Sequence, residues 1–453
     1  MRAKLFLKNT NYKLRAFTQI VAFVALVIFG FAPLIVSYKT LNHMIFDLMI
    51  MDYQDVMDLK MFPLIKGTSS LILIIIVCRC FSERQSFVMA IKQNSVWLIF
   101  AALLLWMTIS VHFINGVTDD VIHGVGLKHE TFQLHIVYYL GFGFLGFVLS
   151  SSQLKMWLFR IYLAVSIILV PVAMYLFRHM YKTLDYIWKT SFECVFSNPN
   201  YYGYFLTVMT GLAAALYVGE KSPKWRLFYL AALVVNTFGL SYNDTLGAWI
   251  GSLFACLFLI VAYRLWNGRF ERRTFSALFI FLIVLLLTGI YNKNILKNIS
   301  SFFYDLGLII IDPYAEDSLH AGSGRWKIWM QTLELIKRHP LFGLGFEGIH
   351  ARGLSSFVGN DRPHNEYLQY AVFYGIPATL LYISACAGIY IRGLKWKERL
   401  DGETMAALVA AFGYLSGAFF GLTVYNTAPY FFIMLGLGYV SIQPAGQFYR
   451  GRL

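Results

Sequence analysis

Stretches of about 20 mostly apolar residues alternate with shorter polar segments along the whole chain. An α-helix needs about 20 such residues to cross the hydrocarbon core of a bilayer. The pattern therefore predicts about twelve transmembrane helices. These predicted spans lie near residues 16–36, 61–79, 94–114, 131–150, 156–177, 201–219, 227–241, 246–264, 274–291, 367–390, 404–423 and 429–446.

Composition supports the same class of protein. Of the 453 residues, 58% are hydrophobic and only 14% are charged, which is too few charges for a soluble surface. Cys78 and Cys80 form a C-x-C without nearby histidines, and two such thiols are more often packing residues than metal ligands. We therefore predict an all-α integral membrane protein with no metal, no cofactor and no disulfide framework.

The charges predict the orientation of the chain. When successive connections are assigned to alternate sides, the amino-terminal side holds 23 of the 38 Lys and Arg but only 6 of the 24 Asp and Glu. The positive-inside rule places that side, and both termini with it, in the cytoplasm. This asymmetry also explains the net charge of +14 without a nucleic-acid partner.

One connection is much longer than the others. Residues 292–366 form an external segment between the ninth and tenth predicted spans, and they divide the chain into helices at 1–291, an external loop, and helices at 367–453. Loops of that length usually carry function. We therefore expect the chemistry to be in this segment.

An amphipathic helix is predicted to begin near Ser323, where the sequence reads SGRWKIWMQTLELIKR. Its apolar residues recur at helical spacing, so it should lie on the membrane surface or over the helix bundle. The predicted apolar stripe consists of Trp326, Trp329, Met330, Leu333 and Ile336.

Arg325 is less easily explained by packing. If Ser323 caps the helix, Arg325 lies in the first turn, where a cation opposes the helix dipole by about 0.3–1 kcal/mol. A bound anion would reverse that penalty, because free backbone amides and a guanidinium together suit a phosphate or pyrophosphate. The alternative is an ordinary solvated arginine.

Two further motifs follow. In HPLFGLGF, Gly343 and Gly345 let the chain turn tightly, or let its backbone approach a ligand. In DRPHNEYLQY, His364 and Asn365 stand at the mouth of the tenth span. Histidine can accept a proton near neutral pH, although a His-Asn pair at a helix start is also a common cap.

These motifs together resemble the bacterial O-antigen ligase and O-antigen polymerase superfamily. The matching elements are SGRWKIW, HPLFGLGF and PHNEYLQY in this order, with FSNPNYYGYFL at 196–206 upstream. The resemblance implies a metal-independent glycosyltransferase of the bacterial inner membrane. It would transfer a glycan from an undecaprenyl-diphosphate carrier to a sugar hydroxyl of a glycan or lipid-linked acceptor, on the external face.

The resemblance also implies roles for residues. Arg325 would stabilise the departing diphosphate, and His364 would act as general base on the acceptor hydroxyl. Many superfamily members carry an arginine after a serine in the turn between the seventh and eighth spans, where this chain reads LSYNDTLGAW. We expect the second diphosphate contact elsewhere. The further candidates for substrate binding are Arg178, Gly343, Gly345, Arg352, Arg362 and Asn365.

Other functions stay open at this stage. A solute transporter such as a bicarbonate carrier is one alternative, although transporters usually place ionisable residues near the bilayer midplane. A scaffold that only binds lipid-linked glycan is another. Polymerase and ligase share the loop and differ in acceptor, so the motifs do not separate them.

Overall fold

The computed structural model describes residues 2–46, 53–84, 88, 96–116, 121, 130–183, 192–196, 198–395 and 401–441, and all regular structure in these ranges is helical. Ten of the described helices are long and apolar enough to cross a membrane. The predicted all-α multi-pass membrane fold is therefore confirmed. The ends of the predicted spans at 94–95 and 442–446 lie outside the described residues.

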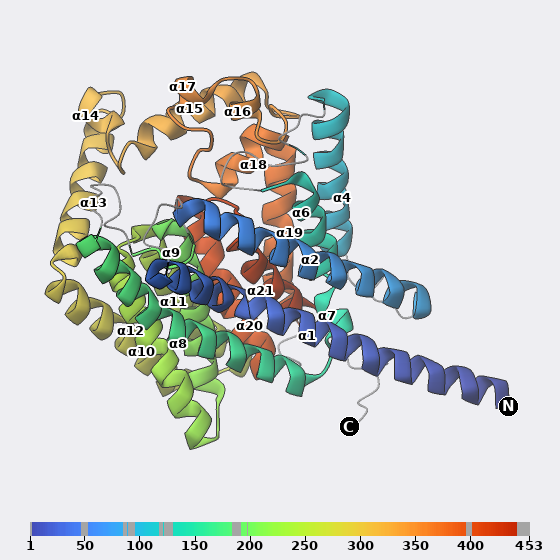
Figure 1. Cartoon of the computed structure of the whole chain (residues 1–453). Helices are drawn as coiled ribbons and strands as arrows, with labels where there is room; N and C mark the ends of the chain where they lie inside the picture. Colours follow the sequence, from blue (N-terminus) through green and yellow to red (C-terminus); the bar gives the residue numbers. More distant parts are fainter. Residues whose placement is uncertain are drawn as a thin grey trace.

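The helices follow the predicted apolar runs closely (Figure 1). Before the long loop they are α1 (Arg2–Phe46), α2 (Tyr53–Ser82), α4 (Val96–Thr108) with the π-helix η1 (Ile109–Ile114), α6 (Phe132–Ile136) with the π-helix η3 (Val137–Phe142) and α7 (Leu145–Val148), α8 (Ser152–Thr183), α9 (Pro199–Gly219), α10 (Pro223–Asn243), α11 (Leu246–Asn267) and α12 (Arg272–Tyr291). After it come α18 (Glu366–Tyr374), α19 (Ile376–Lys395), α20 (Gly402–Gly417) with the 3-10 helix η5 (Ala418–Phe420), and α21 (Ala428–Ser441).

The tenth predicted span is interrupted at Gly375, which divides it into α18 and α19. Gly375 has φ +90°, and a Cβ there would lie 1.8 Å from the carbonyl oxygen of Leu341. The amide of Ile376 donates to the carbonyl of Pro340 at 2.8 Å. The chain can break here because glycine tolerates positive φ and leaves room for the turn after α15 to insert.

Small residues allow close packing at the centre of the bundle. A Cβ on Gly211 of α9 would lie 3.1 Å from the Cα of Ala410 in α20, and one on Gly251 of α11 would lie 2.6 Å from the carbonyl of Gly413. Transmembrane helices associate through such small-residue contacts because their backbones can approach closely. α9, α11 and α20 therefore form a tight core that positions the helix ends around it.

The two ends of the bundle are distinct. At one end, Arg15 of α1 binds Glu83 beyond α2 at 2.5 Å, and Ser152 of α8 donates to Glu403 of α20. At the other end, α9, α11 and α20 meet where Gly247 closely approaches both Tyr204 and Phe420. The connections assigned by charge to the cytoplasm include those at the first end, and the long loop belongs to the second.

The long loop contains α13 (Asn294–Ile311), α14 (Glu316–Leu319), α15 (Arg325–Arg338), α16 (Gly348–Ala351) and α17 (Ser355–Val358). Figure 1 shows α13 standing at the edge of the bundle, with α14 at its tip and α15 leading back toward α18. Asn294 donates to the carbonyl of Ser241 at 2.6 Å, and Trp326 of α15 donates to the carbonyl of Pro313 at 2.9 Å. The loop therefore starts and finishes at the same end of the bundle.

Candidate functional site

α15 packs over the bundle through a face that matches the predicted stripe only in part: Ile336 is buried and Trp329 packs against the core. Its buried residues are Ile328, Thr332, Leu335 and Ile336, whereas Leu333 is exposed. The buried face is turned around the helix axis relative to the predicted one. The prediction counted both tryptophans as buried, but tryptophan and methionine also occupy the edges of an apolar face. The observed stripe has the spacing i, i+4, i+7, i+8, and Arg325 continues it by one turn.

Arg325 is the first residue of α15, as predicted, but Ser323 does not cap the helix. The N-cap is Gly324, without a side-chain cap, and Gly322, Ser323 and Gly324 all have positive φ. In this left-handed turn the amide of Arg325 donates to Gly322 at 3.3 Å, and that of Trp326 donates to Ala321 at 3.3 Å. Two of the amides expected to bind an anion are therefore already engaged.

The guanidinium of Arg325 is half-buried on the bundle-facing side of α15. It forms no hydrogen bond or ion pair with the residues that the structure describes, yet it lies within electrostatic range of Tyr204 in α9. The Tyr204 hydroxyl is buried and also has no hydrogen-bond partner among the described residues. A cation and a hydroxyl donor are thus left without partners at one place, which is the arrangement expected around an anionic ligand.

His364 lies close to the same helix. One turn after Arg325, the indole of Trp329 donates to the carbonyl of Pro363 at 2.9 Å. Trp329 also packs edge-on against Phe419, with ring centroids 5.4 Å apart. Residues i and i+4 of a helix are neighbours on its surface, so Trp329 fixes the backbone next to His364 beside the helix face that carries Arg325.

The imidazole of His364 has a defined hydrogen-bond role. The amide of Asp361 donates to Oδ1 of Asn360 at 2.8 Å, which leaves Nδ2 of Asn360 as the donor to Nε2 of His364 at 2.7 Å. Nε2 is therefore the acceptor nitrogen of the ring. His364 also has φ +51°, an uncommon conformation for a residue other than glycine.

Asn365 is a helix cap. Its side-chain oxygen accepts hydrogen bonds from the amides of Tyr367 and Leu368 at 3.0 and 3.1 Å. This satisfies two of the unpaired donors at the start of α18, so in this structure Asn365 orients His364 through the backbone and not as an exposed ligand.

Arg362 is fully buried and fully paired. It forms a bidentate ion pair with Glu347, and its third nitrogen donates to the carbonyl of Thr423 at 3.0 Å. Each of its three nitrogens thus has a partner within the protein. In this structure Arg362 fastens the loop to the segment after α20, and its role in substrate binding stays a prediction.

The ion pair of Arg362 should contribute strongly to stability. Replacing Glu347 with glutamine leaves a buried guanidinium without its counter-charge, and breaking such a pair costs about 3–5 kcal/mol. We expect Glu347→Gln to lower the midpoint of thermal unfolding in detergent. Glu334→Gln is the control, because Glu334 pairs with Arg338 on the exposed face of α15 and should have little effect. Equal midpoints for the two variants would contradict the role of Glu347.

The two loop glycines face the protein and not an open site. A Cβ on Gly343 would lie 2.6 Å from the carbonyl of Val372, and one on Gly345 would lie 2.8 Å from Cβ of Asn115. Both have positive φ. They serve the turn that inserts beside the break between α18 and α19, since only glycine combines that backbone with such close approach.

The remaining two arginines lie elsewhere. Arg352 is exposed, and it donates to Asn115 at 2.7 Å and to the carbonyl of Leu344 at 3.3 Å. Arg178 is exposed on α8. No contact among the described residues joins either side chain to Arg325 or to His364, whereas Trp329 links the helix of Arg325 to the backbone beside His364.

Buried carboxyl groups near the site were missed from sequence. Glu366 is fully buried and accepts hydrogen bonds from Tyr382 at 2.6 Å and Tyr414 at 3.1 Å. Glu130 is also fully buried, 3.8 Å from His135, and burial raises its pKa to about 8. In the sequence each of these glutamates is an acidic residue next to an apolar run. Ordinary loop residues have the same position, so the sequence does not indicate that these two are buried.

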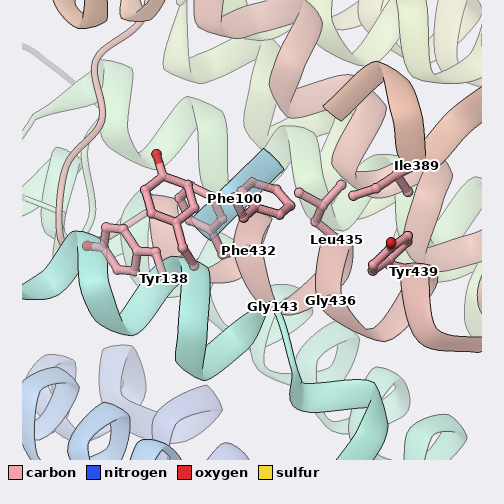
Figure 2. Close-up of a pocket in the computed structure, with 9 residues that line it drawn as sticks. Phe100, Tyr138, Gly143, Ile389, Phe432, Leu435, Gly436 and Tyr439 are labelled. Atoms are coloured by element: carbon pink, nitrogen blue, oxygen red, sulfur yellow. The ribbon is translucent and has the colours of Figure 1, made fainter. Parts of the chain in front are cut away.

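The bundle contains a cavity of about 10 Å³, enough for about one water molecule and far too small for a sugar. Figure 2 shows the side chains around it. It is lined by Phe100, Tyr138, Tyr139, Gly143, Ile389, Phe432, Leu435, Gly436 and Tyr439. Within the described residues no group of three or more His, Cys, Asp or Glu side chains could hold a metal ion. The candidate site is therefore the region of Arg325 and His364 and not this cavity.

The helices define a multi-pass integral membrane protein. Its longest loop holds an arginine without a partner among the described residues, on a helix that also contacts the backbone next to a histidine. Residues 231–383 match the protein family described as O-Antigen ligase. This match confirms the predicted relationship to the O-antigen ligase and polymerase superfamily and supports an enzyme of membrane polysaccharide biosynthesis. The matched segment runs from α10 into α19 and contains both Arg325 and His364. No curated protein matches the chain.

Proposed function

We propose that this protein is a glycosyltransferase of the bacterial inner membrane that moves a glycan from an undecaprenyl-diphosphate carrier to a sugar hydroxyl at the external face. The observation that carries the proposal is the half-buried Arg325, which has no partner among the described residues and lies on the helix that also holds the backbone beside His364. The family match over the same residues supports it. The external face follows from the distribution of basic residues.

The bond that breaks joins the anomeric carbon of the glycan to the diphosphate of the carrier. As it breaks, negative charge grows on the diphosphate oxygen, and a preorganised cation in a water-poor site stabilises that charge. Arg325 is so placed, because the protein gives its guanidinium no other anionic partner among the described residues. In this proposal the guanidinium provides the charge that a metal ion would otherwise provide.

The bond that forms joins the acceptor oxygen to the anomeric carbon, and the hydroxyl proton must go to a base. His364 receives it at Nε2, the nitrogen that now accepts from Asn360. The acceptor hydroxyl would take the place of the Asn360 amide. The products are the extended glycan and undecaprenyl diphosphate, so atoms and charge balance without another reactant.

The proposal is tested with purified protein in liposomes that contain a lipid-linked glycan as donor. We expect longer lipid-linked glycan when the donor is also the acceptor, as for a polymerase, or transfer to a different lipid-linked glycan, as for a ligase. Product size on a gel separates the two. No transfer to either acceptor, together with uptake of labelled bicarbonate by the same liposomes, would contradict the enzyme and favour a transporter.

A further inference from the structure

α13 exposes a continuous apolar stripe. Five residues at helical spacing lie on one side of it, and each is between 39% and 72% exposed. They are Leu296, Ile299, Phe303, Leu306 and Ile310. Ile295 is the one buried residue of this helix, so the described part of the protein leaves much of the stripe uncovered.

Three polar residues on the opposite side of α13 bind the protein. Asn294 donates to the carbonyl of Ser241, Asn298 donates to the carboxylate of Asp244, and Asp305 accepts from the amide of Gly322 at 2.9 Å. These three residues follow the spacing i, i+4, i+11 and so share one face. A helix at an aqueous surface has its apolar face toward the protein, and α13 has the reverse arrangement.

The apolar stripe continues a surface that already belongs to the membrane. α12 is one of the apolar helices long enough to cross a bilayer, and it exposes Leu282, Leu286 and Ile290 along one side. α13 follows it after a tight turn, and a Cβ on Gly289 would lie 2.7 Å from Cβ of Ile295. The apolar surfaces of the two helices therefore adjoin each other.

We propose that α13 contacts the lipid of the bilayer along this stripe without crossing it. Its first turn is tied to the end of α10, and α15, which follows it, packs at the same end of the bundle. α13 therefore contacts lipid at the end of the bundle that carries the long loop.

α13 also determines where α15 sits. Asp305 binds the turn before Arg325, and Pro313 binds Trp326 just after it. A helix held by lipid along one side would keep the start of α15 at the membrane surface, where the head group of a lipid diphosphate lies. This last consequence rests on the proposed function, whereas the lipid contact itself does not.

The lipid contact is tested by spin labelling of the full chain in phosphatidylethanolamine–phosphatidylglycerol liposomes. Labels are placed at Phe303→Cys and Ile310→Cys in a background with Cys78→Ala and Cys80→Ala, because the other three cysteines are buried. Leu286→Cys on α12 is the lipid reference, and Lys327→Cys on the exposed side of α15 is the water reference.

We expect the labels on α13 to be relaxed more by oxygen than by a water-soluble nickel complex, as at Leu286. A greater effect of nickel at both positions, as at Lys327, would overturn the proposal in favour of a water-facing loop. Spin–spin broadening that disappears on dilution with unlabelled protein would also overturn it, in favour of a second copy of the chain. None of these readouts depends on transferase activity.

Discussion

Replacing Arg325 with alanine is expected to lower the rate of glycan transfer by about 10²–10³-fold, the usual effect of removing one preorganised donor from a developing anion. The reason is that Arg325 is half-buried at the start of α15 and has no competing anion among the described residues. The measurement is initial transfer in liposomes at saturating and subsaturating donor. The loss should appear in kcat as well as in kcat/KM, because the charge on the diphosphate grows in the transition state.

Two further variants make the result specific. Arg325→Lys keeps the charge but loses the planar fork that binds two oxygens, so it should recover only part of the rate. Arg338→Ala removes an exposed arginine at the other end of the same helix, where it pairs with Glu334, and should retain the wild-type rate. Full activity of Arg325→Ala at normal protein levels would remove Arg325 from the catalytic site.

Much of the fold could be predicted because its main determinant is local. Each apolar run of about 20 residues has to become a helix in lipid, since every backbone group must be satisfied within the segment. The predicted runs accordingly fall in helices. The interruption at Gly375 could not be predicted, because it depends on the carbonyl of Leu341 arriving from 34 residues away in sequence.

α13 shows a different limit of sequence reasoning. Its residues were assigned to an external loop, and they form a helix apolar enough to be a candidate span. Apolar content alone does not tell which face of a helix meets the protein. The hydrogen bonds of Asn294, Asn298 and Asp305 were needed to orient it.

The candidate site could be predicted only for reactive side chains that stand in a distinctive motif near the start of a helix. Arg325 and His364 stood in distinctive motifs near helix starts, and the structure brings their segments together. Arg362 has the same functional group, but no feature of the sequence predicted that it would form a buried ion pair with Glu347. Pairing between residues that are distant in sequence decides whether an arginine binds a ligand or stabilises the fold.

Three ionisable groups next to the site are removed from water. Glu366, Glu130 and Arg362 are all fully buried at the end of the bundle under the loop. In such surroundings the interaction of a cation with an anion is several times stronger than in water. Arg325, which is half-buried and has no partner among the described residues, is therefore expected to stabilise a diphosphate more than a fully exposed arginine would.

Replacing His364 is expected to lower the rate of transfer by about 10²–10⁴-fold, because the acceptor hydroxyl loses its proton acceptor. The better variant is His364→Asn, since His364 has φ +51° and asparagine tolerates that conformation better than alanine. Asn360→Ala should have a smaller effect. It removes only the residue that fixes the imidazole through Nε2, so Asn360 is a positioning residue.

Donor binding distinguishes a catalytic from a structural role for His364. If the imidazole acts as base, His364→Asn binds the lipid-linked donor with an unchanged Kd while kcat falls, because the diphosphate is held by Arg325. His339→Ala, at the exposed end of α15, should leave both quantities unchanged. A parallel loss of donor affinity and of thermal stability in His364→Asn would instead mean that His364 maintains the shape of the 360–365 segment, and another group would then have to accept the proton.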